Sequence, residues 1–457
     1  MDLLERPRNL SQCKRWKTND EGRKTHTSIE QIKVESSIER IYDRYEQLAA
    51  LDPTLPKINR DDHAHYLQTS LERLTSSYES LDSSRPWMVY WIMNSASILN
   101  LRFSHELLDR VVDFLVKCRA KEGGFGGGPG QYPHLATTYA AVNSLCTIGT
   151  EKALEAIDRR TLKQFFWSVR ESNGAFRMHV GGELDVRGAY CAISSAKLCS
   201  FSPEEEAKLF EGTAAWVAEC QTYEGGFGGA PDLEAHGGYS FCAAAAIMLL
   251  GGEHRCDLHA LLRWTVNRQM AYEGGFQGRT NKLVDVCYSF WQGALVPIVQ
   301  GLIARKEGQQ HIMNVSLFNR YALQEYIILC CQRPTGGLVD KPGKPSDIYH
   351  TCYALSGLAV AQHCETHSPP LVLGNELNEV LPTHPVHNIP PKAALEAYRY
   401  FLEFDQPASA ADERSNGKNE DDVPMDDISE NVSERQSSSN MSEDSSSNYT
   451  SSRASEF

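Results

Sequence analysis

The sequence lacks the features that would place a chain in or beyond a membrane. Its longest apolar stretches, residues 243–250 and 293–304, are too short to span a bilayer as a helix. The N-terminus begins Met1-Asp-Leu-Leu-Glu-Arg and has no apolar core of a secretory signal. The 13 cysteines follow no disulfide-scaffold spacing, so we expect reduced thiols in a core. Together these absences predict a cytoplasmic protein without a transmembrane segment.

An excess of basic residues is also missing. The formal net charge is −14, and most of it falls in residues 405–457, which hold 13 acidic and 4 basic side chains. A nucleic acid would require a basic surface, so we expect no nucleic-acid partner. The Ser- and Asp/Glu-rich composition predicts a disordered acidic tail at 405–457.

What the sequence does contain is an internal repeat. Each copy holds a Gly-rich loop, such as Glu-Gly-Gly-Phe at 122–125, that ends on an apolar anchor. The anchors are Phe125, Phe176, Phe227, Phe276 and Leu338, spaced 51, 51, 49 and 62 residues apart. An amphipathic helical run precedes each loop, and a more uniformly apolar run follows it, as in residues 239–250. A helix that is apolar all round is buried, so each copy predicts an outer helix followed by an inner one.

A weaker sixth copy precedes these five. Its outer helix is expected near 62–79, and its inner helix begins at Pro86-Trp87, since proline suits a first helical turn. Six hairpins bury every inner helix if they close into a ring. The predicted fold is therefore all-α, an α/α toroid around a central cavity, with an open superhelical array as the alternative. We expect this domain at 61–404, after a polar N-terminal extension at 1–60.

Polar residues recur nine positions after each loop anchor, where the inner helix begins. They are His134, Asp185, His236, Asp285 and Asp347. In a ring, these side chains would point from one rim toward a common centre, as an active site requires. The alternative is that they are helix N-caps, a position that suits the aspartates well and the histidines poorly.

A metal site is predicted at the same rim. Eleven positions after one anchor lies Cys287, and twelve after the next lies His350, so two adjacent hairpins bring them together. With Asp285 they form a competent zinc set that leaves a fourth position open for substrate. A buried core cysteine is the alternative interpretation of Cys287.

Beside this set the sequence places a cationic, hydrogen-bonding cluster. Arg279 and Lys282 share one short turn, and His236 and Tyr288 lie at neighbouring rim positions. Several donors at a helix mouth suit an anionic group, and a diphosphate best, with a solvated basic turn as the alternative. Aromatic residues along the inner helices would line a tube for a long hydrocarbon, or form ordinary core. These are Trp87, Trp91, Tyr190, Tyr239, Phe241, Phe290 and Trp291.

Residues from about 60 to 404 resemble the protein prenyltransferase β subunits, and among them those of protein farnesyltransferases. The resemblance rests on several long motifs in order. They are Ser84-Arg-Pro-Trp87, Gly130-Gln-Tyr-Pro-His-Leu135, Gly182-Glu-Leu-Asp-Val-Arg187, Glu234-Ala-His-Gly-Gly-Tyr239, Tyr272-Glu-Gly-Gly-Phe-Gln-Gly-Arg279, Asn281-Lys-Leu-Val-Asp-Val-Cys-Tyr-Ser-Phe-Trp291 and Asp347-Ile-Tyr-His-Thr-Cys-Tyr353. One position differs from the family, because Val286 stands where a glycine is often found.

The resemblance implies a role for each matched residue. Zinc is held by Asp285, Cys287 and His350, with Tyr288 at the catalytic centre, and Mg²⁺ is associated with Asp340. The remaining substrate-binding positions follow as three groups. The farnesyl diphosphate headgroup meets His236, Arg279, Lys282 and Tyr288. The peptide side-chain pocket is lined by Trp87, Trp91 and Tyr349, and Tyr190 and Trp291 are further substrate-binding residues. The peptide carboxylate is held through water by His134, Glu183 and Arg187.

The same resemblance implies a heterodimer with a helical α subunit. The expected reaction is transfer of a farnesyl group from farnesyl diphosphate to the cysteine thiol of a C-terminal CaaX motif, with a zinc-activated thiolate as nucleophile. The nearest rival is a geranylgeranyltransferase type I β subunit. Trp87 and Asp340 favour farnesyl. The resemblance implies that the longer-chain enzyme has a small residue at the position of Trp87 and a lysine at the position of Asp340. A non-catalytic binding toroid is the rival from another class, and a terpene cyclase is disfavoured because 61–404 holds no Asp-x-Asp-Asp motif.

Overall fold

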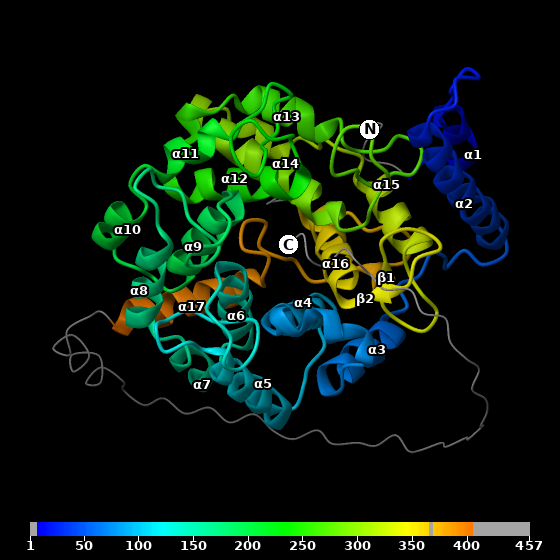
Figure 1. Ribbon diagram of the computed structural model, residues 1–457. Helices are drawn as coiled ribbons and strands as arrows, with labels where there is room; N and C mark the ends of the chain where they lie inside the picture. Colours follow the sequence, from blue (N-terminus) through cyan, green and yellow to red (C-terminus); the bar gives the residue numbers. More distant parts are fainter. Residues whose placement is uncertain (1–6, 365–368, 405–457) are drawn as a thin grey trace, which may run out of the picture.

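Six helical hairpins form a closed ring in the computed structural model, which describes residues 7–364 and 369–404. The inner helices are α4 (Arg85–Ile98), α6 (Leu135–Ile148), α9 (Val186–Leu198), α12 (Gly237–Leu250), α14 (Tyr288–Glu307) and α16 (Ile348–His363). Each inner helix packs against its successor, and α16 packs against α4 (Figure 1). This last contact closes the circle, so the predicted α/α toroid is confirmed and the open array is wrong.

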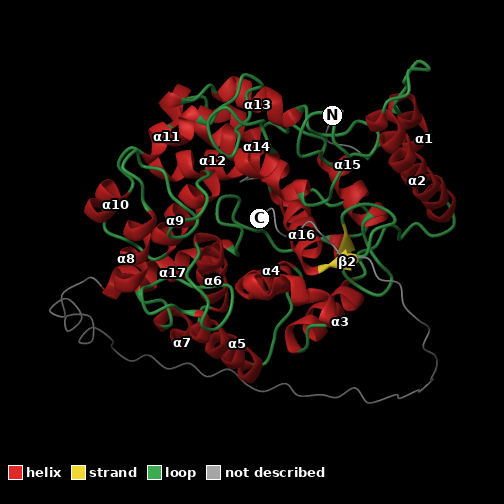
Figure 2. Cartoon of the chain, viewed as in Figure 1, coloured by secondary structure: helices red, strands yellow, loops and turns green. Residues whose placement is uncertain are grey.

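An outer layer of helices surrounds the inner one (Figure 2). Its main members are α3 (Arg60–Glu72), α5 (His105–Cys118), α8 (Arg159–Val169), α11 (Thr213–Glu219), α13 (Leu258–Val266) and α15 (Arg320–Glu325), which a π-turn extends over Tyr326–Cys330. Shorter elements join them: α7 (Glu151–Glu155), α10 (Pro203–Leu209) and a hairpin of β1 (Leu338–Val339) with β2 (Ser346–Asp347). The outer helix expected at 62–79 ends earlier, at Glu72, and residues 76–84 form a 3₁₀ segment before α4.

The two layers follow from the apolar patterns of the helices. Ten of the 14 residues of α12 are buried and the other four are half-buried, as expected for an inner helix that is apolar all round. In α5, by contrast, the buried residues fall on one stripe that includes Leu107, Val111 and Leu115. The Gly-rich loops between the layers need glycine, because Gly123 has φ +97° and a Cβ there would lie 1.8 Å from the carbonyl oxygen of Thr161. These loops therefore pack directly on the next outer helix.

The N-terminal extension does not stand apart from the ring. Residues 7–49, the N-terminal arm, form α1 (Leu10–Cys13) and the 24-residue α2 (His26–Ala49), and α2 packs beside the π-turn (Figure 1). The buried face of α2 consists of Gln31, Glu35, Ile38 and Tyr42. Two of these four are polar, which explains why the sequence showed no apolar periodicity here.

A buried ion pair fastens the arm to the ring. The Arg8 guanidinium Nε lies 2.5 Å from Glu325 Oε2, and both side chains are at least 94% shielded from solvent. Arg8 also donates to the carbonyl oxygen of Tyr272, and Tyr42 donates its hydroxyl hydrogen to the carbonyl of Glu273. The arm thereby covers a Gly-rich loop that would otherwise be exposed.

Removing one partner of this pair should detach the arm. Arg8→Ala leaves Glu325 buried without its cation, a loss of about 3 kcal/mol in docking free energy, because an unpaired buried charge is costly. Hydrogen exchange of the α2 amides should accelerate accordingly. The double variant Arg8→Met/Glu325→Met, which leaves no buried charge, should keep most of the protection. Equal protection in Arg8→Ala and the native chain would show that the pair does not hold the arm.

A strap of chain from the segment before α17 (Pro391–Phe404) lies inside the ring (Figure 1). The carbonyl oxygens of Val386, His387 and Asn388 accept hydrogen bonds from tyrosine hydroxyls of α9, α6 and α4 in turn, at 2.7, 2.9 and 2.8 Å. All three residues are buried. The strap thus ties three inner helices together.

None of the helices in the described part of the chain has the length and apolar character that a membrane span needs. The acidic tail predicted at 405–457 lies outside the described residues.

Candidate active site

The five rim positions are set by the backbone of the repeat. The N–H of His134, His236 and Asp285 donates to the carbonyl of the loop anchor nine residues before it, at 3.0–3.1 Å. After four of the five rim positions, the following residue donates to the loop of the next repeat, as Val286 does to the carbonyl of Asp340 at 2.9 Å. One backbone hydrogen bond therefore fixes the spacing, and a second joins adjacent repeats around the rim.

Four of the five rim side chains are helix N-caps, and Asp285 lies two residues before Cys287, the N-cap of α14. Each accepts a hydrogen bond from a backbone N–H at the start of its inner helix, at distances of 2.7–3.1 Å. The acceptors are His134 Nδ1, Asp185 Oδ1, His236 Nδ1, Asp285 Oδ1 and Asp347 Oδ1. The capping interpretation is thus correct even for the two histidines, where it was expected to fail. It also holds each side chain at the mouth of its helix.

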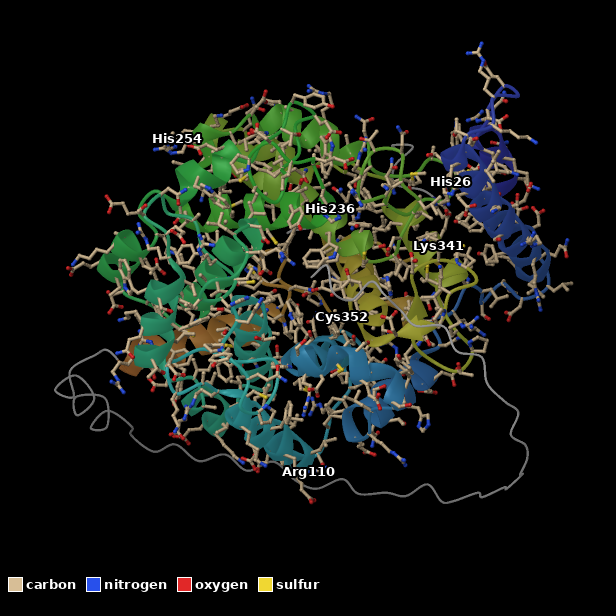
Figure 3. The ribbon with its side chains drawn as sticks, in the orientation of Figure 1. His26, Arg110, His236, His254, Lys341 and Cys352 are labelled. Carbon is tan, nitrogen blue, oxygen red and sulfur yellow. The ribbon has the colours of Figure 1, made fainter. Side chains whose placement is uncertain are left out.

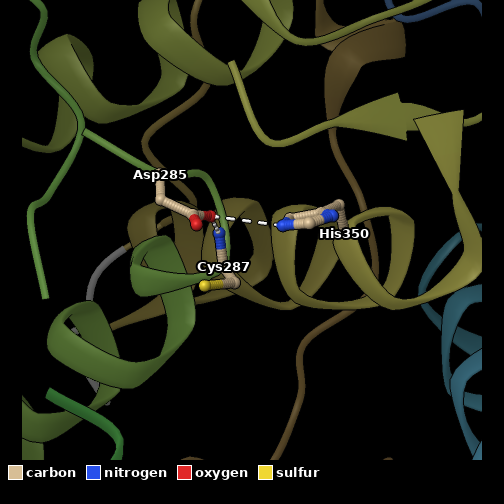
Figure 4. Close-up of side chains that lie close together, drawn as sticks. All are labelled: Asp285, Cys287 and His350. Carbon is tan, nitrogen blue, oxygen red and sulfur yellow. Dashed lines mark hydrogen bonds and ion pairs between the residues drawn. The ribbon is translucent and has the colours of Figure 1, made fainter. Parts of the chain in front are cut away.

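Asp285, Cys287 and His350 come together between α14 and α16 (Figure 4). Their ligand atoms lie within 4.8 Å of one another, and His350 Nε2 is 3.4 Å from Asp285 Oδ1. A single zinc ion with bonds of about 2.0–2.3 Å fits a set of this size. Behind the set, His350 Nδ1 is 2.6 Å from Asp347 Oδ2, which turns Nε2 toward the other two ligands. The chemistry and the spacing of the donors therefore fit zinc.

The charges of this set also favour a cation. Burial and then the neighbouring Asp285 carboxylate raise the pKa of the Cys287 thiol well above its usual range. Burial also opposes ionisation of Asp285, but His350 beside it keeps the pKa of its carboxyl below the usual range. A thiol in this environment keeps its proton unless a metal ion replaces that proton.

Asp340 lies at the edge of the same site. Burial, followed by the charge of Asp285, raises the pKa of its carboxyl to about 6. The ammonium of Lys341 forms a buried ion pair with this carboxylate. Sequence reasoning did not single out Lys341, although its position directly after Asp340 was a signal for it. The assignment of Mg²⁺ to Asp340 stays a prediction.

The predicted diphosphate cluster is only partly assembled by direct contacts. His236 Nε2 lies 2.9 Å from the Tyr288 hydroxyl oxygen. Arg279 is on the adjacent turn, half-buried, and 3.4 Å from Glu234. Lys282 closes that turn through its backbone and is exposed. Figure 3 shows His236 on the inner side of the ring, whereas Arg110 and His254 point outward.

A second polar group lies on the neighbouring stretch of the rim. Glu183 has His134 Nε2 at 3.9 Å and Arg187 Nη2 at 3.7 Å from one carboxylate oxygen. Its other oxygen lies 3.9 Å from Nε2 of His179, a residue that sequence reasoning missed. The His134 and His179 rings are 5.5 Å apart, so two imidazoles flank one carboxylate. The only sequence signal for His179 was its place in the same loop, four residues before Glu183.

Aromatic side chains from all six inner helices form a continuous belt around the ring. Neighbouring ring centroids are 4.3–5.7 Å apart along the whole circuit. The belt runs through Trp87, Trp91, Tyr349, Tyr353, Trp291, Phe241, Tyr190 and Tyr139 and returns to Trp87. It includes the three residues of the predicted peptide side-chain pocket and both of the further predicted substrate-binding aromatics. Tyr139 and Tyr353 were not among them.

Comparison with known proteins agrees with this fold. Residues 58–389 match the family model described as the prenyltransferase alpha-alpha toroid domain. The chain is 39% identical to the protein farnesyltransferase subunit beta of Arabidopsis thaliana, over 83% of this chain and 89% of that protein. It is 39% identical to the subunit of the same name in Schizosaccharomyces pombe, over 78% and 94%.

Relatives with another name are more distant. Identity falls to 29% for the geranylgeranyl transferase type-1 subunit beta of A. thaliana, over 66% of this chain and 85% of that protein. Among solved structures, Candida albicans protein geranylgeranyltransferase-I complexed with GGPP superposes with a TM-score of 0.60 at 20% identity. This match covers 77% of this chain and 100% of the matched chain, and it supports the fold. The chain belongs to the prenyltransferase α/α toroid family, among the protein farnesyltransferase β subunits.

Proposed function

We propose that this chain is the β subunit of a heterodimeric protein farnesyltransferase. It would transfer the farnesyl group of farnesyl diphosphate to the cysteine thiol of a C-terminal CaaX motif. The observation that carries the proposal is the position of the Asp285–Cys287–His350 set. It lies beside the aromatic belt, with the His350 ring 4.9 Å from that of Tyr349, and Cys287 directly precedes Tyr288 of the His236–Tyr288 pair.

Each part of the site has a place in this reaction. When bound to Asp285, Cys287 and His350, zinc would lower the pKa of an acceptor thiol so that it reacts as a thiolate near neutral pH. The chain's own residues would do the rest. Tyr288 and Arg279 would donate hydrogen bonds to the leaving diphosphate, where negative charge grows in the transition state. The aromatic belt would hold the farnesyl chain and keep water out.

The acceptor peptide would be oriented by the second polar group. Arg187 and His134 would hold its terminal carboxylate through water, with Glu183 and His179 completing the hydrogen-bonding network. Lys282 would extend toward the diphosphate from its exposed turn. The α subunit is expected to complete the headgroup pocket, and a cytoplasmic setting stays part of the proposal.

The proposal is tested with the full chain co-purified with an α subunit. The complex should farnesylate a peptide ending in a CaaX motif and should ignore the same peptide with serine in place of cysteine. The isolated chain should show little transfer. Preference for the 20-carbon diphosphate, with no need for Mg²⁺, would instead make the complex a type I geranylgeranyltransferase. No transfer with either donor, and no bound zinc, would indicate a binding module.

The Asp340–Lys341 pair leads to a prediction about Mg²⁺. Lys341 competes with a metal ion for the Asp340 carboxylate, so Lys341→Gln should lower the half-saturating Mg²⁺ concentration about tenfold, the effect of one charge-assisted hydrogen bond. The measurement is the rate of farnesyl transfer against Mg²⁺ concentration. In the matched variant Asp340→Asn the Mg²⁺ response should largely disappear. An unchanged Mg²⁺ curve in Asp340→Asn would place the Mg²⁺ site elsewhere.

A further inference from the structure

A cluster of buried polar side chains lies where the N-terminal arm meets the ring. Two of its members are carboxyls, Glu35 on α2 and Glu273 in the Gly-rich loop after α13, and they are 2% and 1% exposed. The side-chain amide of Gln31 joins them, with Nε2 2.9 Å from Glu35 Oε1 and 2.5 Å from Glu273 Oε1. An amide NH₂ group has two hydrogens, so it donates one to each carboxyl. The two carboxyls therefore face each other across a single nitrogen atom.

The two carboxyls differ in the number of hydrogen bonds they accept. Both oxygens of Glu35 are 3.0 Å from the backbone nitrogen of Thr18, and the Thr18 hydroxyl donates to Oε1 at 2.8 Å. Among the described residues, Gln31 is the one side chain that donates to the Glu273 carboxyl. Donors that point at a carboxylate favour its charged form. A negative charge is therefore more stable on Glu35 than on Glu273.

In the described part of the chain, no cation is left to neutralise a second negative charge in this cluster. The backbone N–H and the Nε of Arg8 both donate to the Glu325 carboxylate, at 3.0 and 2.5 Å. Its Nη1 and Nη2 donate to the backbone carbonyls of Tyr272 and Glu273, not to the Glu273 side chain. Two ionised carboxylates this close, buried and without their own cation, would repel each other strongly. One of the pair must carry a proton, and the hydrogen bonds assign it to Glu273.

The charged and titratable groups around Glu273 come from the arm, its own loop and the outer helix α15 with its π-turn. They are Arg8, Glu35, Tyr42, Tyr272, Glu325 and Cys330. At the edge of the cluster, Lys17 lies over the Tyr272 ring and is paired with Glu39 at 2.7 Å.

These neighbours differ from Glu273 in how they titrate. Burial raises the pKa of the Cys330 thiol to about 12 and raises that of the Tyr42 and Tyr272 hydroxyls above their usual range, so all three keep their protons. Burial also raises the pKa of the Glu325 carboxyl, which the paired Arg8 opposes. For Glu273, burial raises the pKa of the carboxyl to about 7. The charge of Glu273 therefore changes near neutral pH.

We propose that Glu35 and Glu273 share one proton and together form a pH-sensitive latch that holds the N-terminal arm on the ring. In the docked arm the proton is on Glu273. When the arm lifts, both carboxyls meet water, and Glu273 releases its proton with the ordinary acidity of a glutamic acid. Docking therefore takes up one proton, and the equilibrium between the docked and the lifted arm depends on pH.

Acid should strengthen the docking of the arm. The pKa of Glu273 is about 7 in the docked arm, above the ordinary value of 4.5. The stabilisation is therefore fully present below about pH 4.5 and is lost as the pH rises through about 7. The arm should be held most firmly under acidic conditions and should lift most readily under alkaline ones.

The latch acts on the loop that leads into the candidate active site. Arg8 and Tyr42 of the arm donate to the backbone carbonyls of Tyr272 and Glu273, at 2.9 and 2.6 Å. Lifting the arm would leave these carbonyls to water and loosen the loop on which Asp285 follows. The latch itself goes beyond the proposed function and does not depend on which substrate that site binds.

Hydrogen exchange of the α2 amides measures how often the arm lifts. The full chain is co-purified with an α subunit and followed from about pH 5 to about pH 8, with each exchange rate divided by the intrinsic rate of an unfolded peptide at that pH. We expect the protection of α2 to fall about tenfold per pH unit between about pH 5 and 7, as release of one proton requires, and then to level off. The amides of the inner helix α6 are the internal reference and should show no such slope.

Glu273→Gln keeps the shape of the side chain and an acceptor for Gln31 but cannot ionise. Protection of α2 in this variant should stay constant within about twofold over the same range, and at about pH 8 it should exceed that of the native chain about a hundredfold. The matched control is Glu39→Gln on the same helix, which removes a carboxylate outside the cluster and should keep the slope. A native arm without pH dependence, or an equal slope in Glu273→Gln, would overturn the latch.

Infrared spectroscopy observes the proton directly. A protonated carboxyl has a C=O band that is separate from the bands of carboxylates and amides. At about pH 6 the spectrum of the native complex minus that of the Glu273→Gln complex should contain this band, and at about pH 9 carboxylate bands should replace it. Carboxylate bands at the lower pH would show that Glu273 is ionised in the docked arm. The latch would then be wrong, whichever isoprenoid the complex transfers.

Discussion

Replacing Cys287 with alanine should remove most of the zinc from the heterodimer and reduce farnesyl transfer at least about a thousandfold. Loss of one thiolate leaves only Asp285 and His350 as protein ligands. Two ligands cannot hold a zinc ion that needs three. Without the ion the acceptor thiol keeps its proton at neutral pH, and the nucleophile is lost. Zinc content is measured by elemental analysis of the purified complex, and transfer is measured in a single turnover.

The matched control is another buried thiol. Cys146 on α6 is 1% exposed, as buried as Cys287, but it is far from the set in the ring order. Cys146→Ala should retain full zinc and nearly full transfer. Full zinc in Cys287→Ala would mean that the ion is bound elsewhere and that Cys287 is a core cysteine.

The repeat made the rim predictable from the sequence. A backbone hydrogen bond from His236 to the anchor Phe227 fixes a nine-residue spacing, and His134 and Asp285 make the same bond to their anchors. The spacing is therefore visible as a count along the chain. Because adjacent repeats are joined in the same way, Cys287 and His350 could be paired although 63 residues separate them.

Other features were hidden because their pattern is not periodic or not apolar. The buried face of α2 contains Gln31 and Glu35, which read as solvent-exposed, so the docking of the N-terminal arm could not be foreseen. N-capping was weighed for His236 and judged a poor fit because histidine is an uncommon cap, and only the distance to Gly238 shows it. Lys341 was missed because an ion pair between neighbours in sequence depends on the local turn.

The aromatic belt could not be predicted from the sequence either, because it depends on closure of the whole ring. Each inner helix contributes one or two aromatic residues, which in sequence are indistinguishable from ordinary core. Their arrangement as one belt appears only when α16 meets α4 and the Trp91–Tyr349 contact, with centroids 5.3 Å apart, closes the circuit. Ring closure thus turns a common composition into one continuous aromatic belt.

Shortening Trp87 should shift the donor preference toward a longer isoprenoid. Trp87 is 6% exposed, stacks on Trp91 at 5.6 Å and lies 5.7 Å from Tyr139, so it fills the belt between α4 and α6. Trp87→Thr removes the indole and leaves room for additional methylene groups, each worth about 0.8 kcal/mol when buried. Three or four of them correspond to about 2.5–3 kcal/mol, a change of about a hundredfold in relative kcat/KM.

The measurement is competition between the 15- and 20-carbon diphosphates for one CaaX peptide. A buried tryptophan of the outer layer provides the control: Trp216 lies on the outer helix α11 and is 5% exposed, and it is not a member of the belt. Trp216→Thr should lower the free energy of unfolding, as loss of a core aromatic does, and leave the donor ratio unchanged. If Trp87→Thr also left the ratio unchanged, the end of the farnesyl chain would not lie against Trp87, and the length of the tube would be set by other belt residues such as Tyr190.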